Sequence, residues 1–179
     1  MLYKFLSGLA KGVTHCIFRV KVVGKENVPK DGGMILAVNH KSNWDPIFAG
    51  AYCPRPLRFM AKADLFKNKL FGGLIKKLGA FPIQRGRGDI GAIKGAFSIL
   101  KNNDAMLIFP EGHRIKNGKR VKAKLGVSMI AVYAKVPVIP LCISGEYKPF
   151  HKVTVTFGKP ITFEEYYGKK PNNETLQTL

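Results

Sequence analysis

The stretch Met34-Ile35-Leu36-Ala37-Val38-Asn39-His40-Lys41-Ser42-Asn43-Trp44-Asp45-Pro46 decides how this chain folds. Its first five residues are all apolar, which is typical of a buried strand. Residues 47–52 are again mostly apolar and predict a short helix. A strand that passes through a polar loop into a helix indicates an α/β fold, and strand ends in such sheets are where ligands bind.

The polar loop contains a histidine at the end of the strand and an aspartate at the start of the helix. His40 and Asp45 can pair, so that the carboxylate fixes the tautomer of the imidazole and the imidazole acts as a base. A structural interpretation is equally available, because Asp45 before Pro46 suits a helix N-cap followed by proline. This stretch alone leaves both interpretations open.

The charge balance is the unusual feature of the composition. The 179 residues include 30 Lys and Arg against 11 Asp and Glu, a formal net charge of +19. Such an excess predicts an anionic partner, which can be nucleic acid, an anionic membrane surface or a phosphorylated substrate. The length predicts one domain with a core of its own.

The cysteines and the apolar runs indicate the cellular compartment of the protein. Cys16, Cys53 and Cys142 show no C-x-x-C spacing, so we expect reduced thiols in an intracellular protein. No apolar run reaches the roughly 18 residues of a transmembrane helix, and no secretory signal is expected.

Apolar segments of two kinds alternate along the rest of the chain. They predict a single α/β domain with a mostly parallel or mixed central sheet flanked by helices and preceded by an amphipathic N-terminal helix. Further strands are expected at 18–23, 57–60, 79–85, 105–109, 136–143 and 153–158. Further helices are expected at 65–78, capped by Asp64, at 90–102 and at 123–134.

Residues 1–18 predict the amphipathic helix. Its apolar face is expected to contain Leu2, Phe5, Leu6, Leu9, Val13, Cys16, Ile17 and Val20, with Lys4, Ser7, Lys11 and His15 opposite. This pattern suits a helix that lies in a membrane interface and equally a helix packed on its own domain. The net positive charge favours the membrane.

Two more strand ends carry polar side chains. Arg85 follows one strand, and Glu111, His113 and Arg114 follow another. The planar fork of an arginine suits phosphate or carboxylate oxygens. An anionic substrate beside a general base is therefore one interpretation. The alternatives are a surface salt bridge for Arg85 and a local turn network for Glu111 and Arg114.

Four blocks together resemble the glycerolipid acyltransferase family of the 1-acyl-sn-glycerol-3-phosphate (lysophosphatidate) acyltransferase type. They are His40-x4-Asp45, Gly79-Ala80-Phe81-Pro82-Ile83-Gln84-Arg85, Phe109-Pro110-Glu111-Gly112-His113-Arg114 and Val136-Pro137-Val138-Ile139-Pro140. Lys124-Leu125-Gly126 also resembles the family pattern. The periodicity of residues 1–18 and the resemblance together predict three parts: an amphipathic helix over 1–18, an acyltransferase domain over 19–167 and a polar tail over 168–179, truncated relative to relatives.

The resemblance also implies a reaction and the residues that perform it. A fatty acyl group would pass from acyl-CoA or acyl carrier protein to the sn-2 hydroxyl of 1-acylglycerol 3-phosphate, giving phosphatidic acid for phospholipid synthesis. No serine or cysteine lies in a nucleophile motif, which favours direct transfer without an acyl-enzyme. The implied roles are catalysis for His40 and Asp45, substrate binding for Arg85, Glu111, Gly112 and Arg114, and help with the phosphate for Lys116, Lys119 and Arg120.

No metal or bound cofactor is expected, because His40 and Asp45 lack the further ligands that zinc needs. The expected partners are an anionic membrane surface, lysophosphatidate and the acyl donor, without nucleic acid. The protein would be peripheral or monotopic at the cytoplasmic face of the cell membrane. One departure from the family pattern is His113, which stands where relatives usually have Thr or Ser.

Two alternatives accompany this prediction. Within the same class, the acceptor could be glycerol 3-phosphate or another lysolipid. In a different class, the chain could be a non-catalytic basic domain that binds membranes or nucleic acid. A nucleic-acid module would show basic and aromatic residues interleaved on a sheet face or a recognition helix, and the sequence shows neither pattern convincingly.

Overall fold

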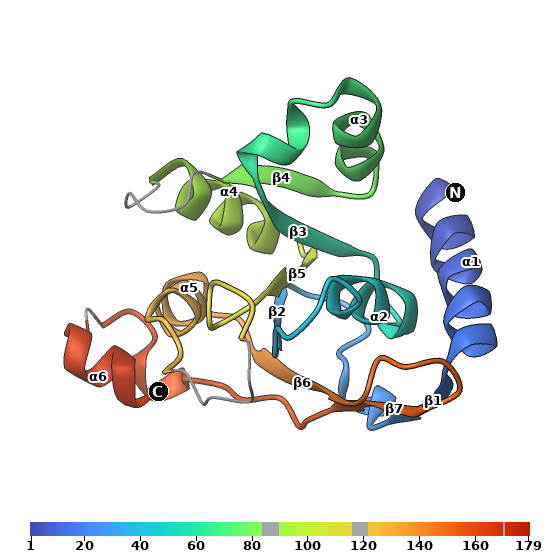
Figure 1. Ribbon diagram of the computed structural model, residues 1–179. Coiled ribbons are helices and arrows are strands. Elements are labelled where there is room, and N and C mark those ends of the chain that lie inside the picture. Colours follow the sequence, from blue (N-terminus) through green and yellow to red (C-terminus); the bar gives the residue numbers. More distant parts are fainter. Residues whose placement is uncertain (84–89, 116–121, 170) are drawn as a thin grey trace.

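The computed structural model of the protein describes residues 1–83, 90–115, 122–169 and 171–179 and contains a seven-stranded sheet flanked by helices (Figure 1). The strands are β1 Arg19–Val23, β2 Met34–Val38, β3 Leu57–Lys62, β4 Ala80–Ile83, β5 Ala105–Ile108, β6 Val138–Gly145 and β7 Lys152–Phe157. The α-helices are α1 Leu2–Ile17, α2 Asp45–Tyr52, α3 Lys69–Lys77, α4 Ile90–Lys101, α5 Gly126–Ala134 and α6 Asn173–Thr178. Short 3₁₀ helices are η1 Lys25–Asn27, η2 Ala63–Phe66 and η3 Glu164–Tyr166.

The sheet is mixed, with the spatial order β1-β7-β6-β2-β5-β3-β4. The neighbours β6, β2, β5, β3 and β4 run parallel to one another. β7 runs antiparallel to β6, and β1 runs parallel to β7. The predicted α/β domain with a mostly parallel or mixed sheet is confirmed.

β2 is the middle strand, and helices cover both of its faces. Met34, Leu36 and Val38 pack in the apolar cluster that includes α2, whereas Ile35 packs in the cluster that includes α4 and α5. These four side chains are fully buried. A strand covered on both faces has no solvent side, which explains why its sequence is apolar without alternation.

α1 packs against α2 through hydroxyl groups. The Tyr3 hydroxyl donates to the carbonyl of Gly50 at 3.3 Å, and the Ser7 hydroxyl donates to the same carbonyl at 3.2 Å. The hydroxyl of Thr14, which is fully buried, lies 2.7 Å from that of Tyr52. The predicted helix is present, and it packs on its own domain.

The side of α1 that faces the domain coincides only in part with the predicted apolar face, of which Ile17 packs on the core. Ser7, which the pattern assigned to the polar side, points to α2 instead. The helix is rotated because its hydroxyl groups find backbone and side-chain partners on α2. The consequence is a row of exposed apolar side chains along the helix: Leu2, Phe5, Leu9 and Val13.

The helix predicted over 65–78 is wrong in its first part. Residues up to Phe66 form η2, and α3 begins after Asn68, whose side-chain oxygen accepts from the N–H groups of Leu70 and Phe71 at 3.1 and 3.0 Å. A Cβ on Gly72 would lie 2.8 Å from the Cα of Phe66. Glycine therefore lets η2 fold back on α3, and the chain bends instead of continuing one helix.

The predicted cap of that helix differs from the structure, and the segment predicted as a polar tail contains a helix. Asp64 forms ion pairs with Lys62 and Lys67 rather than capping α3. Residues 173–178 form α6, in which Leu176 is buried and its carbonyl accepts a hydrogen bond from the Ser128 hydroxyl of α5 at 2.6 Å. The last residues thus pack on the domain through α5.

Within the described ranges, every helix is too short or too polar to cross a membrane.

Arg55 connects two turns at the edge of the sheet where β2 and β5 begin. Its guanidinium donates to the carbonyls of Pro29, Asp31, Gly32 and Asn103 at 3.3, 3.1, 2.7 and 2.6 Å. A planar fork with five donors can serve several carbonyls at once. Arg55 therefore holds the start of β2 beside the start of β5.

We expect Arg55→Ala to lower the free energy of unfolding by about 2 kcal/mol, because hydrogen bonds from a charged donor are lost. Chemical denaturation measures this change. The control is Arg58→Ala, since Arg58 is exposed and, among the described residues, its guanidinium forms an ion pair with Asp104 alone, at 3.0 Å; such surface pairs contribute about 0–1 kcal/mol. Equal losses in the two variants would contradict the role of Arg55.

Candidate active site

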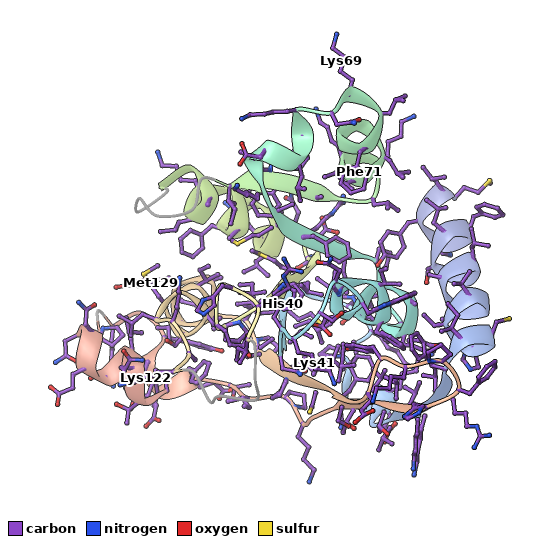
Figure 2. The ribbon with its side chains drawn as sticks, in the orientation of Figure 1. His40, Lys41, Lys69, Phe71, Lys122 and Met129 are labelled. Atoms are coloured by element: carbon purple, nitrogen blue, oxygen red, sulfur yellow. The ribbon has the colours of Figure 1, made fainter. Side chains whose placement is uncertain are left out.

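Two loops that follow parallel strands meet at one edge of the sheet. β2 and β5 are parallel neighbours, so the loops that follow them leave from the same edge. The Ile115 N–H donates to the carbonyl of His40 at 2.8 Å. Arg114 Nη1 donates to Asn43 Oδ1 at 3.0 Å. The structure thus brings together the predicted His40 and Arg114 blocks, and Figure 2 shows His40 near the centre of the molecule.

Asn39 attaches the end of β2 to β6, which sequence reasoning did not predict. Its side-chain amide donates to the carbonyl of Ile143 at 3.1 Å and accepts from the N–H of the same residue at 2.7 Å. This two-way contact fixes where the loop with His40 leaves the sheet. The signal in the sequence was an amide residue directly after the buried strand.

His40 and Asp45 form the predicted pair. His40 Nδ1 lies 3.0 Å from Asp45 Oδ2. Oδ2 also accepts from the backbone N–H groups of Lys41 and Ser42 at 2.6 and 2.7 Å, and Oδ1 accepts from the Tyr147 hydroxyl. An ionised carboxylate only accepts hydrogen bonds, so the proton is on Nδ1 and Nε2 carries a free lone pair.

The interpretation of Asp45 as a helix N-cap is wrong. α2 begins at Asp45 itself, after Trp44, and no side chain caps it. The carboxylate instead turns back to residues 40–42. It does so because the loop offers three donors to a group that has no access to water.

Asp45 is fully buried, yet it is held in the charged state. Burial alone would raise its pKa, but hydrogen bonds from His40, Tyr147, Ser42 and Lys41 outweigh burial and lower the pKa of Asp45 below its ordinary value. The ordinary value for aspartate is about 3.9. The carboxylate is therefore ionised at neutral pH and stabilises a positive charge on His40.

The imidazole of His40 is positioned by a stacking contact as well as by the hydrogen bond with Asp45. It stacks on the ring of Phe109, with centroids 3.9 Å apart and an angle of 19° between the planes. The side chain of His40 is 13% exposed to solvent. Among the described residues, no group forms a hydrogen bond with Nε2, so that atom is available to a ligand.

Gly112 forms a tight turn at the end of β5. Its φ is +71°, a conformation that favours glycine, and its N–H donates to the carbonyl of Phe109 at 2.9 Å. A Cβ on this residue would lie 2.7 Å from Nζ of Lys124. The Lys124 ammonium therefore lies against the loop, although sequence reasoning assigned it no role beyond the Lys-Leu-Gly resemblance.

Glu111 has a buried carboxylate oxygen without a hydrogen-bond partner among the residues that the structure describes. Buried polar atoms are normally satisfied, so such an atom calls for a partner from a ligand or a nearby donor. Its position one residue before Gly112 places this acceptor in the loop that meets His40.

The remaining predicted site residues divide into two groups. His113 is exposed, and Arg114 is exposed apart from its contact with Asn43. Arg85, Lys116, Lys119 and Arg120 lie outside the described residues. Tyr147, which follows β6, was missed, although β6 ends at the same edge as β2 because the two strands are parallel.

The arrangement suits removal of a proton from a hydroxyl group. An oriented imidazole with a free Nε2 can accept the proton, and the buried carboxylate stabilises the resulting imidazolium. Cations of the neighbouring loop can hold an anionic group of the same substrate.

Comparisons with known proteins show which family the chain is similar to. Residues 19–144 match the family model described as Acyltransferase. The chain is 35% identical to the 1-acyl-sn-glycerol-3-phosphate acyltransferase of Streptococcus pneumoniae (strain ATCC BAA-255 / R6), over 100% of this chain and 69% of that protein. It is 32% identical to the enzyme of the same name from Bacillus subtilis (strain 168), over 99% and 91%.

A solved structure shows the same fold. The crystal structure of the 1-acyl-sn-glycerophosphate (LPA) acyltransferase PlsC from Thermotoga maritima superposes with a TM-score of 0.76 at 27% identity, covering 98% of this chain and 74% of that one. The resemblance predicted from the four blocks is therefore confirmed, and the chain belongs to the acyltransferase family.

Proposed function

We propose that this protein is a 1-acyl-sn-glycerol-3-phosphate acyltransferase, which transfers a fatty acyl group from a thioester to the sn-2 hydroxyl and forms phosphatidic acid. The observation that carries this proposal is the buried His40–Asp45 pair, with Nε2 free, at the point where the Arg114 loop meets it. The names of the full-length relatives agree with it.

The reaction follows from the orientation of His40. An alcohol is a weak nucleophile at neutral pH, so Nε2 takes its proton while the oxygen attacks the thioester carbonyl. The tetrahedral intermediate collapses with cleavage of the carbon–sulfur bond. The imidazolium, stabilised by Asp45, then returns the proton to the departing thiolate. The acyl group moves directly from sulfur to oxygen, without an acyl-enzyme.

The loop after β5 would bind the acceptor. Arg114 donates to its phosphate from a position fixed by Asn43, and Lys124 beside Gly112 adds a second cation. The buried oxygen of Glu111 would accept a hydrogen bond from the acceptor's glycerol or from an arginine. By resemblance, Arg85 and the basic residues Lys116, Lys119 and Arg120 complete the phosphate site.

The acyl donor is a thioester of coenzyme A or of acyl carrier protein. Because these donors are cytoplasmic, the protein would act at the cytoplasmic face of the membrane. Glycerol 3-phosphate and other lysolipids carry the same hydroxyl and phosphate groups, so they are the alternative acceptors to be compared.

Two exposed apolar surfaces support peripheral binding to an anionic membrane. The first is the row Leu2, Phe5, Leu9 and Val13 on α1. The second lies on η2 and α3, where Leu65, Leu70, Phe71 and Leu74 are exposed, Leu70 to 89%. Leu70, Phe71 and Leu74 therefore do not pack in the core of the domain.

Lysines accompany the α3 surface. Lys69, Lys76 and Lys77 of α3 are exposed, and Figure 2 shows Lys69 pointing away from the body of the protein. Apolar side chains beside lysines suit the boundary between the headgroups and acyl chains of anionic lipids. The net charge of +19 acts in the same direction.

We expect His40→Ala to lower kcat by about 10²–10⁴-fold in an acyl-transfer assay with lysophosphatidate and acyl-CoA or acyl carrier protein, because the general base is lost. Asp45→Asn should also lower kcat, because the imidazolium loses its stabilising charge. His151→Ala is the control, since His151 is exposed and contacts Glu146. Wild-type activity in His40→Ala would refute the mechanism. The same assay with glycerol 3-phosphate compares the acceptors.

Arg114→Ala should raise the KM for the phosphate acceptor about 10- to 100-fold, because a charge-assisted contact with the phosphate is lost. The matched measurement uses a monoacylglycerol, which lacks the phosphate. Its slow reaction should proceed at the same rate with wild type and variant. A KM for lysophosphatidate that does not change would remove Arg114 from the acceptor site.

Membrane binding is tested with two double variants, Phe5→Ser with Leu9→Ser and Leu70→Ser with Phe71→Ser, in sedimentation with vesicles that contain anionic phospholipid. Each pair should reduce the partition coefficient at least about tenfold, because full burial of such a side chain contributes about 1.5–3 kcal/mol. Tyr133→Ser on α5, an exposed aromatic side chain elsewhere, is the control. Undiminished binding by both double variants would rule out these surfaces.

A further inference from the structure

Tyr147 contacts the carboxylate of Asp45 from the opposite side to His40. Its hydroxyl donates to Oδ1, whereas His40, Lys41 and Ser42 all donate to Oδ2. Within the described residues, Tyr147 is thus the one donor to Oδ1. The rotation of the carboxylate about the Cβ–Cγ bond of Asp45 is therefore fixed by this hydroxyl together with the Oδ2 donors.

The ring of Tyr147 has a defined position. It stacks on Phe48 of α2, with centroids 5.6 Å apart and 21° between the planes, and it meets Phe18 edge-on at 6.1 Å. Burial and the hydrogen bond to Asp45 both raise the pKa of Tyr147. The hydroxyl is therefore protonated throughout the physiological range and remains a donor.

Lys41 holds the same segment from the loop of His40. Its ammonium donates to the carbonyl of Gly145 at 2.6 Å and lies 4.6 Å from the centroid of the Tyr147 ring. The loop that contains the general base thus also fixes the segment that positions its carboxylate. The connection between β6 and β7 becomes part of the site.

We propose that Tyr147 is a positioning residue, which keeps Asp45 Oδ2 turned to His40 and withdraws negative charge from the carboxylate through Oδ1. The proposal rests on the acyltransferase function proposed above. Without the hydroxyl, the carboxylate would turn more freely and the imidazole would lose its fixed direction. Without the hydrogen bond to Oδ1, the Asp45 carboxylate would also carry more negative charge towards His40. This charge would favour the protonated imidazole, which cannot act as a base.

The test is Tyr147→Phe, which keeps the ring and its packing on Phe48. We expect kcat to fall about tenfold with little change in the KM for lysophosphatidate, since the Tyr147 hydroxyl donates to Asp45 and is proposed to act through it. The acid limb of the pH profile of kcat/KM should move to higher pH, because more of the enzyme holds a protonated imidazole at a given pH. A purely structural role would change the melting temperature but not this limb.

Tyr52→Phe is the matched control. Tyr52 stacks on the same Phe48, at 5.9 Å, and its hydroxyl bonds to Thr14 and His15 instead of Asp45. We expect this variant to lose stability while its kcat per folded molecule and its pH profile stay as in wild type. Equal shifts of the acid limb in both variants, or none in Tyr147→Phe, would overturn the proposal.

The two hypotheses fail in different ways. An active His40→Ala variant would refute the general-base mechanism itself. An inactive His40→Ala variant together with an unchanged Tyr147→Phe variant would refute only the role of Tyr147.

Discussion

A carboxylate that is fully buried needs hydrogen-bond donors at both oxygens, and Asp45 imposes this requirement at the centre of the molecule. The donors come from segments far apart in the sequence: the loop after β2 and the connection between β6 and β7. Both segments must therefore follow one path, which Asn39 and Lys41 reinforce by bonding to β6. The start of α2 lies at the same place, and a negative charge in the first turn of a helix is favourable. The fold and the site thus depend on the same charge.

The same donors explain why the pair is suited to catalysis. Each hydrogen bond that offsets the cost of burying Asp45 also fixes the direction of the carboxylate, so that the imidazole has one orientation before a substrate arrives. Phe109, the first residue of the block that contains Glu111 and Arg114, stacks on the imidazole and fixes its plane. The order of the two motifs in the chain is therefore less important than the parallel pairing of β2 and β5, which brings their ends together.

The sequence predicted those features that depend on local pattern. The apolar run of β2 indicated a buried strand, and the polar residues at strand ends indicated His40 and Arg114. Contacts between distant segments escaped prediction. Tyr147 follows an ordinary strand and is marked only by its partner, 102 residues away. The start of α3 depends on the approach of Phe66 to Gly72. The orientation of α1 depends on hydroxyl contacts with α2, which a pattern of apolar residues does not report.

The orientation of α1 connects the proposed membrane binding with the position of the proposed base. A helix that packs through Tyr3, Ser7 and Thr14 and exposes Phe5 and Leu9 reverses the arrangement expected for a helix surrounded by water. Its partner in these contacts is α2, whose first residue is Asp45. α2 has 8 residues and is about 12 Å long, so the carboxylate that contacts His40 lies within one short helix of the contacts with α1. If α1 lies in the interface as proposed, α1 and α2 together would set the distance of His40 from the membrane. A lysophospholipid could then keep its acyl chain in the lipid while its hydroxyl reaches Nε2.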